Sequence, residues 1–275
     1  MKPSQPIPKT AASRVTWNPA DYAAHSALQQ TWARELLARI PWRGDERVLD
    51  VGCGDGKVTA ELARALPRGR VVGVDVAPEM IRFAREQFPP RRFPNLKFEV
   101  MDARALRFER QFDLVFSNAT LHWVDDHVAF LRGAAAALVP GGRLLVSAGG
   151  RGNADAVFHA LRAVMRRERW RAFFRRMSRP YFFYAPDHYA LWLSQAGFKP
   201  RAIRLVPCPA RFRHAAEFLA WLRTTWLPYT QRVPENLREA FLAEIADRYL
   251  TRPAAGTGGD ILVDLVRLEL DAVRI

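Results

Sequence analysis

In the first half of the chain, short apolar runs alternate with longer stretches in which apolar residues recur every three or four positions. The runs are rich in Val, Leu and Phe and predict buried strands at 47–52, 70–76, 95–102, 112–119 and 141–149. The stretches between them have helical spacing, as in residues 78–88, where Pro78 suits the first turn of a helix. This alternation predicts an α/β fold with a parallel sheet covered by helices.

After residue 150 the rhythm changes. The pattern predicts a helical region to about 180, a helix at 186–198, a strand at 201–209, and helices at 214–227 and 234–250. A Gly-rich break at 254–260 precedes residues 261–275, which alternate apolar and charged positions as an edge or antiparallel strand would.

Aromatic residues within 161–180 recur with the period of a helix. Trp170, Phe173, Phe174 and Met177 fall on one side of such a helix, while the arginines between them fall on the other. The segment therefore predicts an amphipathic helix whose arginines face water.

Length and composition predict one globular domain. The chain has 275 residues, of which 49% are hydrophobic, so residues 15–275 can form a single core after a Pro-rich polar tail at 1–14. No apolar stretch approaches the length of a membrane span, and the start lacks the apolar centre of a signal peptide, so we expect a cytosolic protein. Cys53 and Cys208 cannot make a disulfide framework or a metal-ligand set, so we expect reduced thiols and no metal.

The formal net charge is +14, and such a field attracts anions: nucleic acid, acidic proteins, anionic lipid or small carboxylates. The densest block of arginines is again 161–180, in which Glu168 is the single acid. We interpret this block as a solvated helix face in preference to a docking site.

The segment "VLDVGCGDGK", residues 48–57, follows a predicted strand and opens a helix, where backbone amides allow a ligand to lie close to the chain. Its pattern, Asp-x-Gly-x-Gly-x-Gly, differs from the dinucleotide loop and from the phosphate loop, so a pyrophosphate is not the expected occupant. Asp50, before the first glycine, suits a ligand with a positive centre, such as the ammonium group of a methionine moiety.

Two further acids end the next two predicted strands. Asp75 closes the second strand, where a carboxylate can accept hydrogen bonds from both hydroxyls of a ribose. Asp102 closes the third strand, where it can accept a hydrogen bond from an adenine amine. Together with Asp50, these acids outline one elongated ligand that consists of amino acid, ribose and adenine.

Five segments now carry a resemblance. In order and spacing, "VLDVGCGDGKVTAELA", "VVGVDVAPEMI", "NLKFEVMDA", "FDLVFSNATLHWV" and "LVPGGRLLV" resemble the motifs of the class I S-adenosylmethionine-dependent methyltransferases. The resemblance is close over about residues 15–150 and loose beyond them. Within that superfamily, "WNPADYAAHSALQQ" and "LHWV" are similar to the group that contains trans-aconitate, juvenile-hormone-acid and malonyl carrier-protein methyltransferases, which esterify carboxylates.

The resemblance implies a seven-stranded, mostly parallel sheet in the order 3-2-1-4-5-7-6, with helices on both faces. Strand seven would be antiparallel, and residues 261–274 fit that place. The resemblance also implies helical lid elements at about 151–180 and 211–250.

The resemblance implies S-adenosylmethionine as cofactor and assigns residues to it. The expected cofactor-binding residues are Tyr22, Asp50, Gly52, Gly54, Asp75, Met80, Asp102, Ala103, Asn118 and Ala119. Of these, Asp50 and the two glycines would hold the methionine part, Asp75 the ribose, and Met80 with Asp102 and Ala103 the adenine.

The residues expected to position the substrate are Gln29, His122 and Trp123, of which Gln29 and Trp123 match positions that face the substrate carboxylate in acid-methylating relatives. The aconitate enzyme has a basic residue where Gln29 stands here. That difference bears on whether this chain takes the same tricarboxylate.

The leading hypothesis is O-methylation of a carboxylate on a small or medium acid, either free or bound to an acidic acyl carrier protein. A carboxylate is ionised at pH 7 and needs no general base, whereas a hydroxyl or amine would need one, for which His122 and His25 are the candidates.

Three alternatives stay open: O-, N- or C-methylation of a natural-product intermediate, cofactor binding without catalysis, and a basic RNA-binding or RNA-modifying protein. The segment "SNATLHW" argues against the last, because it lacks the Asn/Asp-Pro-Pro-Tyr/Phe loop associated with methylation of base amino groups.

Overall fold

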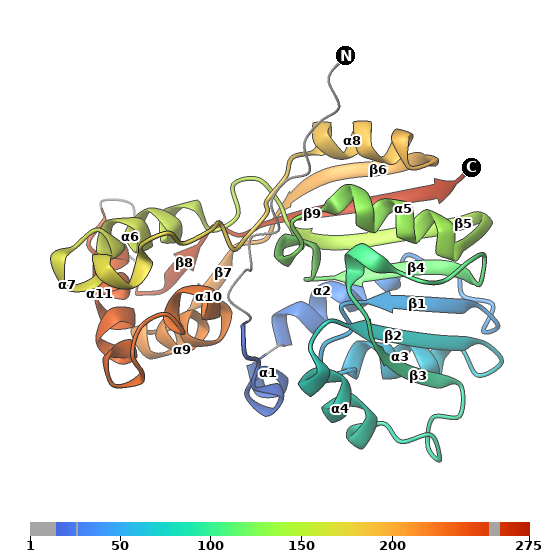
Figure 1. Ribbon diagram of the computed structural model, residues 1–275, viewed down its shortest axis with the longest axis horizontal. Coiled ribbons are helices and arrows are strands. Elements are labelled where there is room, and N and C mark those ends of the chain that lie inside the picture. The colour runs from blue at the N-terminus through green and yellow to red at the C-terminus, as the bar shows by residue number, and fades with distance from the viewer. Residues whose placement is uncertain (1–14, 26, 253–258) are drawn as a thin grey trace.

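A seven-stranded sheet occupies one end of the molecule and a lobe of helices the other, as the computed structural model shows (Figure 1). The structure describes residues 15–25, 27–252 and 259–275, so the predicted tail 1–14 lies outside the described residues. The strand order is β3-β2-β1-β4-β5-β9-β6. Strand β9 runs antiparallel to both β5 and β6, whereas β1 to β5 are parallel. The predicted order is confirmed, with β9 as strand seven.

The strands of the large sheet are β1 Arg47–Val51, β2 Arg70–Asp75, β3 Leu96–Val100, β4 Phe112–Asn118, β5 Leu138–Gly149, β6 Phe198–Pro207 and β9 Val266–Arg274. Two short strands, β7 Ala210–Phe212 and β8 Ile261–Val263, form a separate antiparallel pair. The α-helices are α1 Pro19–His25, α2 Ala27–Leu37, α3 Lys57–Ala65, α4 Pro78–Gln87, α5 His127–Ala137, α6 Asp155–Met165, α7 Glu168–Arg171, α8 Pro186–Gln195, α9 Ala215–Thr225, α10 Leu227–Thr230 and α11 Arg238–Leu250. Short 3-10 turns occupy η1 Ala103–Ala105, η2 Leu121–Trp123, η3 Ala172–Phe174 and η4 Glu235–Leu237.

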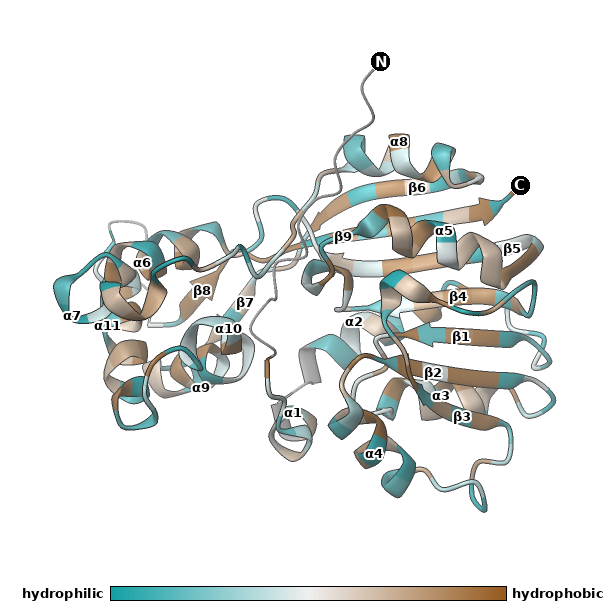
Figure 2. Cartoon of the chain, viewed as in Figure 1, coloured by the Kyte–Doolittle hydropathy of each residue, from teal (hydrophilic) through white to brown (hydrophobic). Residues whose placement is uncertain are grey.

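Alternate residues of the central strands face opposite sides of the sheet. Val48 packs in a cluster with residues of α2, α3 and α4, whereas its neighbour Leu49 packs in a cluster with residues of α5 and α8. Both side chains are fully buried, because helices cover both faces. Figure 2 accordingly shows the central strands as largely hydrophobic.

The helical lobe, which comprises α6, α7, α9, α10, α11, β7 and β8, has a hydrophobic cluster of its own. Trp170 and Phe241 are fully buried members of this cluster, with ring centroids 5.2 Å apart. This lobe contains most of the two segments expected to act as lids.

The prediction of an amphipathic helix through 161–180 is wrong. Helix α6 ends at Met165, extended backbone at Arg167 starts the short helix α7, and η3 follows directly. The chain bends around Phe241, which Trp170 contacts edge-on and Phe174 stacks against at 5.3 Å. Tertiary packing therefore outweighs the helical spacing, while the arginines of the segment remain exposed as expected.

Residues 261–275 form two strands where the pattern predicts one. Strand β8 belongs to the lobe and β9 to the large sheet, and the chain crosses between them at Asp264 and Leu265. There the carbonyl oxygens of Asp264 and Leu265 accept hydrogen bonds from Ala154 and Cys208. The break thus satisfies backbone groups that a continuous strand would pair elsewhere.

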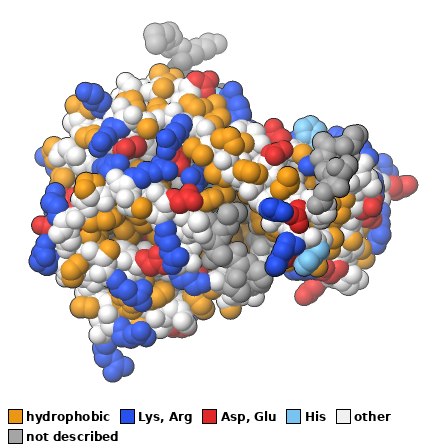
Figure 3. Space-filling model, turned by 180° about the vertical axis from the view of Figure 1, so that it is seen from behind, with side chains coloured by type: hydrophobic (Ala, Val, Ile, Leu, Met, Phe, Trp, Pro, Cys, Tyr) orange, Lys and Arg blue, Asp and Glu red, His pale blue; other side chains and the backbone are white. Residues whose placement is uncertain are grey.

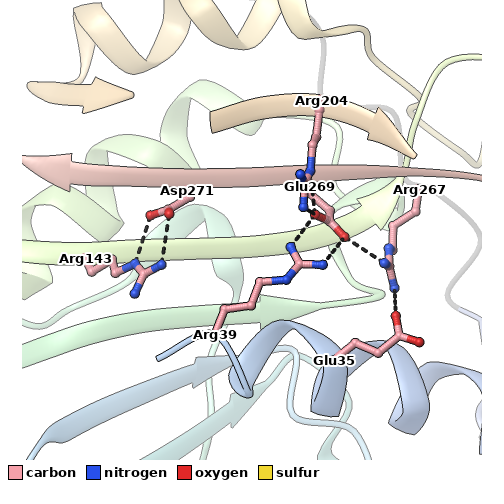
Figure 4. Close-up of polar contacts among 7 residues, drawn as sticks. All are labelled: Glu35, Arg39, Arg143, Arg204, Arg267, Glu269 and Asp271. Carbon is pink, nitrogen blue, oxygen red and sulfur yellow. Dashed lines mark hydrogen bonds and ion pairs between the residues drawn. The ribbon is translucent and has the colours of Figure 1, made fainter. Parts of the chain in front are cut away.

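A network of charged side chains fastens α2 to β9 (Figure 4). Glu269 is 4% exposed and accepts hydrogen bonds or ion pairs from Arg39, Arg204 and Arg267 at 2.6–2.7 Å. Burial would raise the pKa of Glu269, but the surrounding guanidinium groups outweigh it and lower that pKa. Arg267 also reaches Glu35 of α2 at 3.0 Å. The network holds the helix that carries Gln29 and Trp32.

Basic and acidic side chains are interspersed over both ends of the molecule on the face seen in Figure 3. Among the helices that the structure describes, none is long and apolar enough to cross a membrane. Cys53 and Cys208 are both free thiols.

Candidate active site

A pocket of about 540 Å³ lies between the carboxyl ends of the parallel strands and the helical lobe. On the sheet side its wall is formed by Tyr22, Gln29, Trp32, Gly52, Gly54, Asp75, Val76, Ala77, Glu79, Met80, Arg104, Asn118, Ala119, Thr120, His122, Trp123 and Gly149. On the lobe side and at the mouth it is formed by Val15, Trp17, Asn153, Met177, Ser178, Pro180, Trp221, Thr224, Thr225, Pro228, Arg232 and Leu265. This is the edge at which open parallel sheets bind ligands.

The main chain of the glycine loop lines the pocket at Gly52 and Gly54, where no side chain covers it. Gly52 has φ +78°, and a Cβ there would lie 2.0 Å from Oγ1 of Thr120, so no side chain fits. At Gly54 a Cβ would extend toward Tyr22 and Met80, at 3.5 and 3.7 Å. The loop therefore allows a ligand to lie directly against the main chain.

Asp75 ends β2 and lies in the pocket wall. Its two carboxylate oxygens accept hydrogen bonds from the amides of Gly54 at 3.0 Å and Ala77 at 2.9 Å. Burial raises the pKa of Asp75, and these backbone hydrogen bonds oppose the rise. The carboxylate is thus held in one orientation, between the glycine loop and the start of α4.

An apolar surface flanks Asp75. Val76 follows it directly and is 58% exposed although it is a large hydrophobic residue, while Met80 of α4 is 3% exposed and lines the same wall. An exposed aliphatic side chain in a pocket marks a place for a flat apolar ligand group. Sequence reasoning missed Val76, and a hydrophobic residue directly after a strand-ending acid is the signal that could have found it.

Asp50 lies beneath the glycine loop and not in the main pocket wall. Its Oδ2 accepts a hydrogen bond from the hydroxyl of Thr59 at 2.7 Å, and the side chain is 2% exposed. Burial raises the pKa of Asp50 to about 7. Asp50 instead lines a small adjoining cavity that Tyr22, Gln29 and Asn118 also line.

Asp102 and Ala103 also lie outside the pocket wall, and Arg104 takes their place there. The carboxylate of Asp102 accepts hydrogen bonds from the backbone amide and the guanidinium of Arg104, at 2.6–3.1 Å. Partial burial would raise the pKa of Asp102, but these hydrogen bonds outweigh it and lower that pKa. The carboxylate expected at the adenine edge is therefore already engaged by a neighbour that the sequence analysis did not single out.

Two buried acceptor atoms in the wall have no partner among the described residues: Oε1 of Gln29 and Oδ1 of Asn118. The amide nitrogen of Asn118 donates to the backbone oxygen of Gln29 at 2.9 Å, which joins β4 to α2. A buried hydrogen-bond acceptor without a partner costs free energy, so a ligand group that donates hydrogen bonds is expected to bind these two oxygens.

The backbone turns sharply after Asn118. Ala119 has φ +54°, a conformation that non-glycine residues rarely adopt. The turn brings Thr120 against Gly52, where its hydroxyl donates to the oxygen of Gly52 at 3.2 Å or of Asn118 at 3.0 Å. Strain of this kind is found mainly where a site requires it.

His122 lies deeper, in η2, among aromatic rings. Its Nδ1 accepts a hydrogen bond from the backbone amide of Gly149 at 3.2 Å, so the neutral ring carries its proton on Nε2. Burial lowers the pKa of His122 to about 3, and the charge of His127 adds to the effect. At neutral pH this imidazole can therefore donate a hydrogen bond, but its conjugate acid is too strong for it to act as an effective base.

Three aromatic rings form a continuous edge of the pocket. Trp17 packs edge-on against Tyr22 and Trp123, with centroids 5.6 and 5.2 Å apart. Burial raises the pKa of Tyr22, and the nearby carboxylates of Asp55 and Asp75 raise it further. The side chain of His25, the other histidine considered as a base, lies outside what the structure describes.

Comparisons with known proteins agree with this geometry. A family model described as a methyltransferase domain matches residues 48–142. A trans-aconitate 2-methyltransferase of Variovorax paradoxus (strain S110) is 33% identical over 269 residues, which cover 94% of this chain and 99% of that protein. One from Shigella flexneri serotype 5b is 30% identical over 259 residues, covering 94% and 98%. The chain belongs to the class I S-adenosylmethionine-dependent methyltransferases.

The methyltransferase also shares its fold with solved structures. The YcgJ protein from Bacillus subtilis superposes with a TM-score of 0.61 at 17% identity, covering 91% of this chain and 99% of that one. At that identity the likeness concerns the fold alone.

The pocket of this methyltransferase fits S-adenosylmethionine. The bare backbone of the glycine loop, the fixed carboxylate of Asp75 and the exposed apolar side chain of Val76 lie in one wall. The unpaired acceptors of Gln29 and Asn118 add a place for an ammonium group. Of the thirteen residues singled out in the sequence, ten line the pocket, and Asp50, Asp102 and Ala103 do not.

Proposed function

We propose that this methyltransferase esterifies a carboxylate of a small free acid. The observation that carries the proposal is the hydrogen bond from the amide of Gly149 to Nδ1 of His122, which occupies the lone pair that a base would need, and burial lowers the pKa of this ring as well. A hydroxyl or amine acceptor needs a group to take its proton, whereas a carboxylate is already ionised. The names of the relatives, trans-aconitate 2-methyltransferases, support the same acceptor.

The residues of the chain would then divide the work as follows. Asp75 would accept the ribose hydroxyls, while Val76 and Met80 would contact the adenine face. The oxygens of Gln29 and Asn118 would accept from the ammonium group, with Gly52, Gly54 and Ala119 leaving room along the main chain. Bound there, S-adenosylmethionine supplies a methyl group made electrophilic by the positive sulfur.

At the acceptor end, Nε2 of His122 and the indole of Trp123 would donate hydrogen bonds that orient the substrate carboxylate. One carboxylate oxygen of the substrate would form a bond to the methyl carbon while the electron pair of the carbon–sulfur bond remained on sulfur. The products would be a methyl ester and S-adenosylhomocysteine, with no proton released. Most of the rate would come from holding the reactants in line at about 3 Å.

We further propose that residues 151–180 and 211–250 act as a lid. Residues of both segments line the pocket opposite its sheet side. The first segment contributes Met177, Ser178 and Pro180, and the second contributes Trp221, Thr224, Thr225, Pro228 and Arg232. A wall of this kind excludes water from the transferred methyl group.

The test is release of S-adenosylhomocysteine against a panel of aliphatic acids, phenols and amines, with the product identified by mass. We expect methyl esters, and a kcat with chemistry rate-limiting that stays constant from pH 5.5 to 8. Turnover of a phenol or amine with loss of rate near pH 6 would contradict the proposal, because it would reveal a base of the kind that His122 is not.

A further inference from the structure

Two arginines line the pocket, and they differ in what their side chains already bind. Arg104 donates to the carboxylates of Asp102 and Asp125, at 2.6 and 2.8 Å, so its charge is neutralised within the chain. Arg232, which follows α10, has no carboxylate within 4 Å in the part of the chain that the structure describes. Arg232 thus lines the pocket without an ion pair to any described carboxylate.

The contacts of Arg232 are few. Nη1 lies 3.4 Å from the backbone oxygen of Phe173, and Nε is buried with no hydrogen-bond partner. A backbone carbonyl carries no net charge, so this hydrogen bond does not neutralise the guanidinium. A cation held at a partly buried place without a counter-ion is unfavourable, and an anionic ligand would relieve that cost.

Arg232 also lies where two cavities meet. It lines the main pocket and, with Arg238, a neighbouring cavity of about 440 Å³. The acids of the main pocket lie on its sheet side, Asp75 at the end of β2 and Glu79 in the first turn of α4. The pocket is therefore negative where the sulfonium cofactor binds and positive on the lobe side.

A substrate with one carboxylate would leave this charge unused, because that carboxylate must lie at the methyl-transfer point near His122 and Trp123. Resting on the proposed carboxyl methylation, we propose that Arg232 binds a second carboxylate of the substrate. The enzyme then selects acids that carry two or more carboxylates. The positively charged group that binds the second carboxylate would therefore come from the lobe, because Gln29 on the sheet side is uncharged.

The experiment compares three acids built on one carbon–carbon double bond: crotonate with one carboxylate, glutaconate with two and trans-aconitate with three. We expect the wild type to prefer the two polyacids in kcat/KM. In Arg232→Met, the ratio of kcat/KM for trans-aconitate to that for crotonate should fall roughly 10- to 100-fold, the size of one charged hydrogen bond. The loss should lie in KM and not in kcat.

Two further variants make the result specific. Arg232→Lys keeps the charge without the forked geometry and should restore part of the ratio. Arg238→Met removes the arginine that lines only the neighbouring cavity, and the ratio should stay within about twofold of the wild type, as for a screened surface charge. Thermal unfolding of each variant reports whether it is folded.

Equal turnover of crotonate and trans-aconitate by the wild type, or an equal loss for all three acids in Arg232→Met, would overturn the role of Arg232 while carboxyl methylation stood. If the wild type methylates phenols or amines and none of the acids, the proposed function fails and the role of Arg232 fails with it.

Discussion

The sheet side of the pocket includes backbone and polar groups at the ends of strands, whereas the lobe side is formed by helices and by the loop at 177–180. Asp75, Asn118 and Gly52 each stand one residue or less from a strand end, so the register of the sheet sets their positions. Trp221 and Thr224 belong to α9, and Arg232 follows α10. Trp221 packs against the hydrophobic cluster of the lobe, which includes Trp170 and Phe241. The sheet side therefore depends on the ends of strands, and the lobe side depends on a hydrophobic cluster.

Removing one ring of that cluster should separate the two sides most clearly. Trp170→Ala should cost about 3–5 kcal/mol of stability, because a fully buried ring is lost from the lobe. It should raise KM for the acid substrate more than Kd for S-adenosylhomocysteine, as measured by kinetics and titration calorimetry. Trp192→Ala, on the sheet-packed helix α8, is the control; the same pattern in both variants would mean that the two sides are not distinct.

The converse change acts on the glycine loop. Gly52→Ala combines a backbone cost of roughly 1–2 kcal/mol with overpacking against Thr120 of roughly 1–3 kcal/mol. Gly141→Ala is the matched control, because Gly141 has φ +77° but nothing within 4 Å of a Cβ, so it bears the backbone cost alone. Denaturant unfolding and binding of S-adenosylhomocysteine should both be affected more in the first variant. Equal effects would show that the close approach of Thr120 does not matter.

The two strand-ending acids should differ in their effect on cofactor affinity. Asp75→Ala should weaken binding of S-adenosylhomocysteine on the order of 10- to 100-fold, since its carboxylate lies in the pocket wall. Asp102→Ala should weaken it less than about fivefold, because that carboxylate is engaged by Arg104 and partly exposed. Titration calorimetry measures both affinities. A larger loss of affinity in Asp102→Ala than in Asp75→Ala would instead support the contact between Asp102 and adenine that the sequence predicts.

The smallest effect is expected on the outer surface of the lobe. Arg166, Arg175 and Arg176 are exposed, whereas Arg167 and Arg169 pair with Glu244. Replacing the first three with Gln should change KM for a free acid less than about twofold.

Two other outcomes of that replacement would identify other partners. A higher KM for an acyl carrier substrate alone, mimicked by added salt, would assign the surface to an acidic carrier protein. RNA affinity that falls on the order of a thousandfold between 50 and 200 mM salt would indicate a nucleic-acid partner.

The sheet and most of the cofactor side were predictable, because each strand is a short apolar run and each polar site residue follows one directly. The run before Asp75 and the run before Asn118 are examples. The boundaries of the helices in the lobe were less predictable. Helical spacing through 161–180 survives only in pieces, since the chain must bend to place both Trp170 and Phe174 against Phe241.

Some site residues could not be placed from spacing at all. The residues next to Arg232 in the sequence do not mark it as a pocket residue among the other arginines of the chain. Asp102 ends a predicted strand just as Asp75 does, and only the structure shows that Arg104 binds the carboxylate of Asp102. The protonation state of His122 is likewise invisible in "LHW", because it follows from burial and from the amide of Gly149, which lies 27 residues away.

The amino-acid pattern was enough to predict the alternation of strands and helices, the strand ends at which polar groups gather, and the glycine loop, because these depend on residues close to one another in the chain. The folded chain was needed to show which charges are neutralised, which polar atoms lack partners and which aromatic rings close the pocket. Those properties depend on burial and on partners from distant segments, as in the pairing of Arg104 and the isolation of Arg232.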